Sequence, residues 1–389
     1  MSWRAIDLTS LAAAPLAVLA PSGYAFEAEG TKHVIYLGFA GDRSDGQLHE
    51  LWSANGNAWN HTPLFNDIDA RPASGPPSGY AFAGEGSQHA IYGGNPSSSA
   101  DNSDIYEIYW QSGDKASNNL TAAAHLPPAV IGARGYDLNG QVIVFMGLDG
   151  HVWVAERGTS GDWNAYDLTS RYNVPVVAAD TPTAFKQVDP ITHYTFVNIL
   201  FMSADGDVHR FLGSGEAWTY ENITQNATRA PPAFESPLGF SDELGVAFVT
   251  YKSSDQNIYL LKNTTIGISE PWGEPGRITG IEGSPLAALA TSLTGYLFPY
   301  DNSLHVNYVD VDGLINEIWS GDGLEWHWNP LTQNYGGLPS VSGLSAHAFA
   351  KDNTQHVLYT AANHHIWEYE WTPREIIVHP RPRPTGPIR

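Results

Sequence analysis

Residues 33–52 decide the fold and read His-Val-Ile-Tyr-Leu-Gly-Phe-Ala-Gly-Asp-Arg-Ser-Asp-Gly-Gln-Leu-His-Glu-Leu-Trp. Two runs rich in aliphatic and aromatic residues flank Asp45-Gly46, and this dipeptide accepts the positive φ angles of a tight hairpin turn. Similar short runs lie at 23–26 and 59–64. The region therefore predicts four short antiparallel strands, and it has no sustained helical periodicity.

Three landmarks of this unit recur in the same order along the chain. The first is Trp followed, after at least three residues, by Asp-Leu-Thr or a close relative. A proline follows a few residues later, and then a strand that ends in aromatic or aliphatic residues. Seven copies occur. Four successive copies begin at Trp163, Trp218, Trp272 and Trp326, at intervals of 55, 54 and 54 residues. Four strands per unit at this period are typical of the blades of a β-propeller.

We therefore expect one all-β domain over residues 1–375, a seven-bladed β-propeller of four-stranded antiparallel blades. The seventh copy lacks a good outer strand, and residues 3–9 (Trp-Arg-Ala-Ile-Asp-Leu-Thr) supply one. Pairing this N-terminal strand into blade seven would close the ring. Residues 375–378 are the competing candidate for that strand. Residues 376–389 are rich in proline and arginine, which predicts an extended basic tail outside the core.

The composition narrows the function further. With 41 acidic against 19 basic residues, the formal net charge is −22, which disfavours binding to nucleic acid or to an anionic membrane surface. No run approaches the ~20 apolar residues of a membrane-spanning helix, so we expect no membrane insertion. Residues 11–20 resemble a signal-peptide core but fall in register with the repeat. The compartment stays open: a soluble cytoplasmic or secreted protein without an evident cleavable signal peptide, with a homo-oligomer allowed.

Sequence patterns of common catalytic sites do not occur. There is no Gly-x-Ser-x-Gly, no His-Glu-x-x-His, no phosphate-binding glycine loop and no calcium loop. With no cysteine, thiolate chemistry is also excluded. The pair His364-His365 suggests a hairpin tip rather than a metal site, because neighbouring strand residues face opposite sides. We expect no catalytic residues, no metal and no cofactor.

Blades one, two, six and seven share a pattern that the other blades lack. It consists of His and Tyr on the second strand and Glu, often followed by an aromatic residue, on the third. The sets are His33/Tyr36/Glu50/Trp52, His89/Tyr92/Glu107/Tyr109, His305/Tyr308/Glu317/Trp319 and His356/Tyr359/Glu368. Blades three to five carry other residues there, among them Val142, Asn198 and Leu260. A mid-blade carboxylate costs free energy unless it is paired or reached by water, so its repetition indicates a shared purpose.

Two interpretations of these sets stay open. In the structural one, His and Glu form hydrogen bonds across adjacent strands while Tyr and Trp fill the core between blades. In the functional one, Glu and His form hydrogen bonds with sugar hydroxyls and the aromatic rings stack on the apolar face of the sugar. The candidate stacking residues on the outer strands are Trp3, Trp59 and Trp326.

The motifs His-Val-Ile-Tyr-Leu-Gly, Asp-Gly-x-Leu-His-Glu-Leu-Trp and Trp…Asp-Leu-Thr resemble those of the bacterial seven-bladed propeller lectins typified by the Photorhabdus fucose-binding lectins. The resemblance covers nearly the whole chain except the tail. The chain is more distantly similar to the six-bladed fungal fucose lectins of the Aleuria type. The resemblance implies a multivalent carbohydrate-binding protein with sites between neighbouring blades, whose partners are fucosylated or O-methylated glycans. The motif weakens in blades three to five, so fewer than seven sites are expected.

Two other functions compete with a lectin. A propeller glycosidase would need one particular pair of acids flanking the scissile bond, whereas the acids here are repeated. A protein-interaction scaffold is allowed by the fold, although the Trp-Asp dipeptide of common scaffold propellers is missing. Under the leading hypothesis Glu50, Glu107, Glu317 and Glu368 accept hydrogen bonds from sugar, and no reaction is catalysed.

Overall fold

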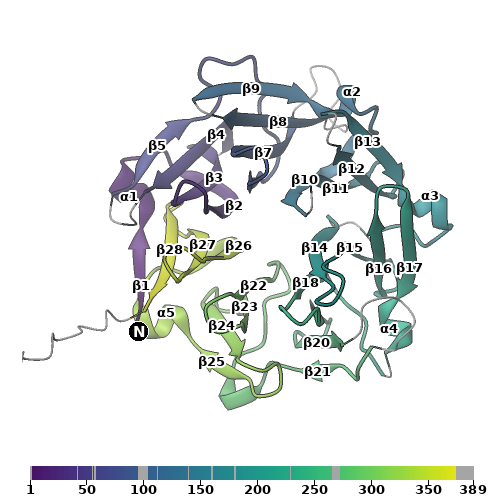
Figure 1. Cartoon of the computed structure of the whole chain (residues 1–389). Coiled ribbons are helices and arrows are strands. Elements are labelled where there is room, and N and C mark those ends of the chain that lie inside the picture. The colour runs from purple at the N-terminus through teal and green to yellow at the C-terminus, as the bar shows by residue number, and fades with distance from the viewer. Residues whose placement is uncertain are drawn as a thin grey trace, which may run out of the picture.

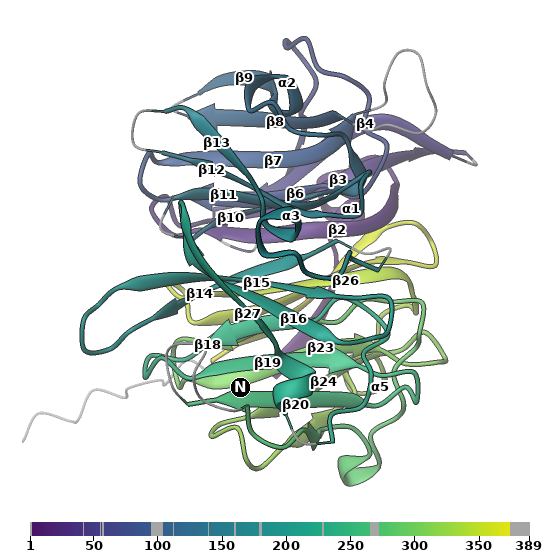
Figure 2. The ribbon, with the colours of Figure 1, turned by 90° about the vertical axis from the view of Figure 1, so that its right-hand side faces the viewer.

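The computed structural model of the chain describes residues 2–41, 43–54, 56, 58–94, 104–111, 113–138, 140–158, 161–178, 181–227, 229–264 and 272–373. These residues form seven four-stranded antiparallel sheets arranged in a ring around a common centre (Figure 1). The chain is thus a seven-bladed β-propeller, as the repeat predicts. Figure 2 shows the ring edge-on, with the hairpin between β14 and β15 extending beyond it. The predicted tail and the competing strand at 375–378 lie outside the described residues.

Each blade begins at the channel with its first strand and ends at the rim with its fourth. Blade one contains β2 (Ala17–Phe26), β3 (Thr31–Ala40), β4 (Arg43–Ser53) and β5 (Asn60–Pro63). Blade two contains β6 (Ser78–Phe82), β7 (Ser87–Gly94), β8 (Asp104–Gln111) and β9 (Asp114–Asn119). Blade three contains β10 (Ala129–Asp137), β11 (Gln141–Gly147), β12 (Val152–Arg157) and β13 (Trp163–Asp167). Blade four contains β14 (Thr183–Val188), β15 (Thr195–Met202), β16 (Val208–Ser214) and β17 (Ala217–Asn222).

The remaining blades follow the same order. Blade five contains β18 (Leu238–Ser241), β19 (Ala247–Lys252), β20 (Ile258–Asn263) and the short β21 (Gly276–Arg277). Blade six contains β22 (Thr294–Phe298), β23 (Ser303–Val309), β24 (Ile315–Ser320) and β25 (His327–Asn329). Blade seven contains β26 (Ser340–Phe349), β27 (Thr354–Ala361), β28 (Ile366–Thr372) and β1 (Ser2–Asp7).

The N-terminal strand closes the ring, which confirms the predicted closure. β1 pairs antiparallel with β28 over six residue pairs, from Ser2 opposite Thr372 to Asp7 opposite Trp367. Figure 1 shows the purple β1 beside the yellow β28. Blade seven therefore contains both the first and the last strand of the chain. This pairing holds the two ends of the ring together.

Five short helices follow outer strands at the rim, a feature that the sequence analysis did not predict. They are α1 (Leu8–Ala12), α2 (Leu120–Ala123), α3 (Leu168–Tyr172), α4 (Ile223–Asn226) and α5 (Leu331–Tyr335), and a single 3₁₀ turn, η1, spans Ile281–Gly283. Asp7 is the N-cap of α1, and its side chain accepts a hydrogen bond from the Ser10 amide. None of the helices in the described ranges has the length and apolar character needed to cross a membrane.

The Asp-Leu-Thr motif is a structural joint between the outer strand and its neighbour. Its aspartate or asparagine caps the helix in blades two, three, four and seven, and its leucine or isoleucine is buried. The threonine hydroxyl accepts a hydrogen bond from an amide at the start of the third strand, at 2.8–3.1 Å. These pairs are Thr9–Ile366, Thr121–Ile105, Thr169–Val152, Thr224–Val208, Thr279–Ile258 and Thr332–Ile315. The motif thus anchors the outer strand in six of the seven blades.

The hydrophobic core lies between the blades rather than within one. Each apolar cluster combines side chains of neighbouring blades, as where Ile35 of blade one packs with Tyr92 of blade two. The inner strands approach closely enough to require glycine: a Cβ atom on Gly79 would lie 2.7 Å from the ring of Tyr24 in the preceding blade. The blade faces therefore meet as complementary surfaces, and each groove between them belongs to two blades.

Because the same threonine bond occurs in blade seven and in blade three, removing it should destabilise the protein by a similar amount in either blade. Thr9→Val and Thr169→Val keep the side-chain shape but leave a buried amide without its acceptor. Each variant should lower the free energy of unfolding by about 1–3 kcal/mol. Urea denaturation followed by tryptophan fluorescence measures the change. Unfolding free energies within error of wild type for both variants would show that the hydroxyls contribute nothing.

Candidate binding grooves between the blades

The predicted His/Tyr/Glu sets divide between the two faces of each blade. His33 stands directly opposite Trp52, and Ile35 stands opposite Glu50, so His33, Glu50 and Trp52 share one face. Tyr36, three residues after His33, is on the other face. The face with His and Glu packs against the next blade, whereas Tyr36 packs against the preceding one, in a cluster with Leu358. A set defined along the sequence therefore contributes to two different grooves.

The tyrosines of the sets are buried and belong to the core. The Tyr36 hydroxyl donates to the Pro15 carbonyl at 3.1 Å, and that of Tyr308 donates to the Pro285 carbonyl at 3.0 Å. The ring of Tyr359 stacks on Tyr369, with centroids 5.7 Å apart. Burial raises the pKa of all three phenols well above the usual value. The bonds of Tyr36 and Tyr308 join the second strand to the proline landmark of the repeat.

In the same four blades, His and Glu form a buried chain of hydrogen bonds across adjacent strands. The His Nδ1 atom lies 2.7–2.8 Å from a Glu Oε1 atom in the pairs His33–Glu50, His89–Glu107, His305–Glu317 and His356–Glu368. The His Nε2 atom lies 2.6–2.7 Å from the hydroxyl of Thr31, Ser87, Ser303 or Thr354, two residues earlier. Each chain holds the carboxylate in a fixed orientation toward the next blade.

An aromatic ring on the inner strand completes each chain, and the sequence analysis missed it. Tyr24, Tyr80 and Tyr296 stack on the histidine of their own blade, with centroids 4.9–5.1 Å apart. Their hydroxyls donate to Gln88, Gln141 and Gln355 of the following blade. The signal was present as a recurring Gly-Tyr after Ser or Thr on the first strand. In blade seven His347 takes this place and stacks on His356.

We name each groove by the two blades that form it. Groove 6/7 contains a cavity of about 250 Å³. It is lined by Trp3, Asp301, Ser303, His305, Glu317, Trp319, Asn329, Tyr335, Gln355 and Trp371. The amide of Asn329 donates to Glu317 Oε2 at 2.9 Å, while Oε1 contacts His305. Trp319 and Trp371 are half-buried, so part of each ring faces the cavity. Four predicted site residues, Trp3, His305, Glu317 and Trp319, thus meet in one groove.

Groove 1/2 is built on the same plan with one important exchange. Its cavity of about 410 Å³ includes Glu50 and Thr62 of blade one and Trp110 and Lys115 of blade two. By strand register, Trp110 corresponds to Trp371, and Lys115 stands where groove 6/7 has Trp3. Burial lowers the pKa of Lys115, and Asp67 and Glu50 act in the opposite direction. Groove 1/2 therefore combines a carboxylate with an ammonium group.

Groove 7/1 is filled by charges of the protein itself. Lys32 of blade one forms a buried ion pair with Glu370 at 2.6 Å, and Arg4 contacts the same carboxylate. The predicted residues His356, Glu368 and Trp59 lie in this groove and are almost fully buried. Burial raises the pKa of Glu368, against the influence of Lys32 and Arg4. Lys32 and Arg4 thus pair with Glu370, while Glu368 of the motif contacts His356 of its own blade.

The other grooves differ in chemistry. Groove 2/3 contains Glu107, whose Oε2 accepts from Asn118, and the half-buried Tyr109. Groove 5/6 is apolar: Trp326 packs in a cluster with Phe248 and Leu260.

A cavity of about 880 Å³, which the sequence analysis did not foresee, lies around blade three and reaches residues 82–85 of blade two as well as Val197 and Gly215 of blade four. Its lining includes Glu156, Asn164 and Tyr166. Burial raises the pKa of Glu156 against the hydrogen bond from the Gly215 amide.

Several solved lectins share the propeller fold of this chain. It superimposes on the BP39L lectin from Burkholderia pseudomallei with a TM-score of 0.65, covering 92% of this chain and 96% of that one at 14% identity. The six-bladed Aleuria aurantia lectin, described with a novel fucose recognition mode, gives a TM-score of 0.53, covering 92% and 93% at 12% identity. Identities this low show a common fold. No protein-family model matches the chain, and no curated protein matches its sequence.

The buried histidine of blade seven predicts sensitivity to acid. Both ring nitrogens of His347 are shielded from solvent without a hydrogen-bond partner among the described residues, and burial lowers its pKa well below the usual 6.5. The unfolded chain binds a proton at this residue below pH ~6.5 but the folded one does not, so stability falls as the pH decreases. His347→Tyr, which installs the ring of the other blades, should reduce the loss between pH 7 and pH 5 by about 1–2 kcal/mol.

Urea denaturation of both proteins at the two pH values measures this difference, and the comparison at pH 7 isolates the effect of packing. An equal loss in the variant would show that His347 takes up its proton in the folded state.

Proposed function

We propose that the protein is a multivalent lectin that binds terminal sugars in grooves between neighbouring blades. The observation that carries the proposal is groove 6/7, where a fixed carboxylate and a histidine lie among three tryptophans and a tyrosine. Sugars present hydroxyls at their edges and an apolar C–H face, and aromatic rings beside hydrogen-bonding groups match both. The fold shared with lectins supports this function.

The preferred ligand is a terminal fucose or a related sugar, O-methylated ones included. The cavity of about 250 Å³ is near the lower limit of small-molecule pockets, which suits one terminal monosaccharide better than a chain. A methyl group on the sugar, whether C6 of fucose or an O-methyl, would pack on a tryptophan ring. The Aleuria lectin of the same fold has been solved with Fucα1-6GlcNAc, at a TM-score of 0.52 and 12% identity.

We propose binding without catalysis. The hydroxyl, imidazole and carboxylate of Ser303, His305 and Glu317 follow one another as in a nucleophile, base and orienting acid. However, Ser303 is only 2% exposed and also donates to Asp301. Ser87 in blade two is equally buried. Repetition of the chain in four blades suits several equivalent binding sites, because linked sites raise avidity.

A glycan array tests the proposed function directly. We expect selective binding to glycans with terminal fucose or O-methylated sugars and no turnover of chromogenic glycosides. A blank array together with hydrolysis of a glycoside would favour an enzyme. A blank array without turnover would favour a protein-interaction scaffold.

The stacking role of groove 6/7 predicts the effect of one substitution. Trp319→Ala removes a half-buried ring from the cavity and should weaken binding at this site about tenfold or more, equivalent to ~1.4 kcal/mol. Lys262→Ala is the matched control, because Lys262 holds the same register position in blade five, in the apolar groove 5/6. Isothermal titration with the sugar selected on the array measures both. Unchanged affinity and stoichiometry in Trp319→Ala would refute a site in groove 6/7.

If grooves 1/2 and 6/7 act together, the double variant Trp110→Ala/Trp319→Ala should bind a multivalent glycan surface at least about a hundredfold more weakly than wild type. Each single variant should retain part of this avidity. Surface plasmon resonance on a dense glycan layer measures the effect. Equal loss in one single variant and in the double variant would restrict binding to one groove.

A further inference from the structure

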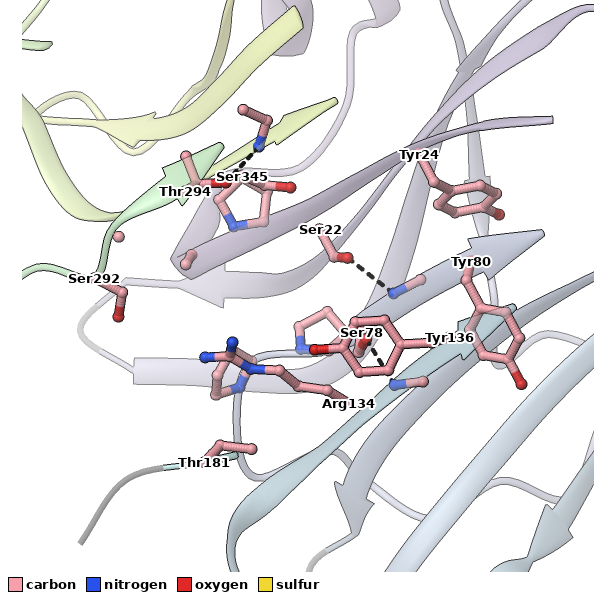
Figure 3. Close-up of a pocket in the computed structure, with 18 of the residues that line it drawn as sticks. Ser22, Tyr24, Ser78, Tyr80, Arg134, Tyr136, Thr181, Ser292, Thr294 and Ser345 are labelled. Carbon is pink, nitrogen blue, oxygen red and sulfur yellow. Dashed lines mark hydrogen bonds between the residues drawn. The ribbon is translucent and has the colours of Figure 1, made fainter. Parts of the chain in front are cut away.

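The central channel contains a polar cavity that is separate from the grooves between the blades. Its volume is about 540 Å³, and inner-strand residues around the ring line it. Figure 3 shows serine, threonine and tyrosine side chains around this space, with Arg134 extending into it. Apart from Tyr24 and Tyr80, whose rings stack on His33 and His89, the residues that line this cavity have no part in the proposed lectin sites. The cavity therefore requires an explanation of its own.

A series of hydroxyls joins the inner strands of consecutive blades. Thr294 Oγ1 accepts from the Ala346 amide, and the same contact runs from Ser345 to Gly23, from Ser22 to Gly79 and from Ser78 to Gly135, at 2.9–3.1 Å. Dashed lines in Figure 3 mark the bonds that Ser22 and Ser78 accept. Each hydroxyl uses a lone pair to accept an amide, and its own proton stays available as a donor.

Arg134 ends this series. It stands immediately before Gly135, as Ser22 and Ser78 stand before Gly23 and Gly79. A guanidinium has no acceptor, so the hydroxyl bond to the next blade cannot form here. No ion pair or hydrogen bond joins the Arg134 side chain to any residue in the described ranges, although the protein as a whole is strongly acidic. The blade-three position therefore presents five N–H donors to the cavity.

Few carboxylates of the cavity lining could accept hydrogen bonds from the Arg134 guanidinium. Of the described residues that line the cavity, Asp137 is the one carboxylate, and it accepts a hydrogen bond from the Ala83 amide. The tyrosines Tyr24 and Tyr80 direct their hydroxyls to glutamines of the next blades rather than to the channel. The cavity thus contains the guanidinium of Arg134 together with serine and threonine hydroxyls that can donate hydrogen bonds.

We propose that the central channel binds one small oxyanion, held by the Arg134 guanidinium and by the hydroxyls of Ser22, Ser78 and Ser345. Guanidinium groups bind carboxylates and tetrahedral oxyanions with two parallel N–H···O bonds, and hydroxyl protons complete the coordination. A free carboxylate and an inorganic anion such as phosphate present the same chemistry. Because the site lies on the propeller axis, one anion would contact several blades at once.

Equilibrium dialysis of the full chain with radiolabelled phosphate, sulfate and acetate, at constant ionic strength, tests the proposal. We expect saturable binding of one anion per chain, and the preferred probe distinguishes an inorganic anion from a carboxylate. Arg134→Gln should weaken binding at least about tenfold, and Arg134→Lys should retain part of it. The matched control is Arg277→Gln, which removes the same charge from the exposed outer strand of blade five.

Sugar binding on the array and the thermal unfolding midpoint confirm that each variant is folded. Failure of the lectin proposal would leave this test unaffected, because the probes are not sugars. The proposal is overturned if no probe saturates at one per chain, or if Arg134→Gln binds the anion as well as Arg277→Gln does.

Discussion

The pairing of β1 with β28 is the constraint on which the rest of the structure depends. A propeller blade buries both of its faces only against neighbours, and the core clusters of this protein all combine two blades. An open ring would leave one face of blade one and one of blade seven exposed. Six backbone pairs, the cap at Asp7 and the buried Leu8 join the first residues of the chain to its last strand. Because every blade is packed between two neighbours once the ring is closed, we expect the seven sheets to unfold together as one unit.

Closure also determines how the proposed binding sites are built. Since each groove receives one face from each of two blades, no blade carries a complete site. Glu317 and Trp319 come from blade six, but Trp3 and Trp371 come from opposite ends of the chain and meet only because β1 is the outer strand of blade seven. Groove 6/7, which is lined by three tryptophans, is therefore complete only when β1 pairs with β28.

The sequence allowed the fold to be predicted almost completely, because landmarks repeated seven times leave few alternatives. The number of blades, their four strands and the closing strand are confirmed. The site was harder to predict. Tyr36 seemed to belong with His33 because the two are close in sequence, but three residues along a strand place them on opposite faces. Trp326 and Trp59 resemble Trp3 in their blades, yet their surroundings depend on the preceding blade, which the repeat does not reveal.

The seven grooves show how one repeat can hold sites of different chemistry. Where the following blade offers Gln355 and Trp371, the Glu of the motif faces a cavity; where it offers Lys32, the space is occupied by an ion pair with Glu370. A buried carboxylate is stable in either setting, provided that its hydrogen bonds are satisfied. The histidine supplies the bond to Oε1 within the blade, and in blades two and six an asparagine of the outer strand supplies the bond to Oε2. In blade seven Oε2 of Glu368 has no hydrogen-bond partner among the described residues, and burial raises the pKa of this carboxyl. The structural role and the proposed binding role are therefore compatible. The hydrogen-bond chain that rigidifies the blade also fixes a carboxylate toward the groove, and the neighbouring blade determines whether that carboxylate faces a cavity.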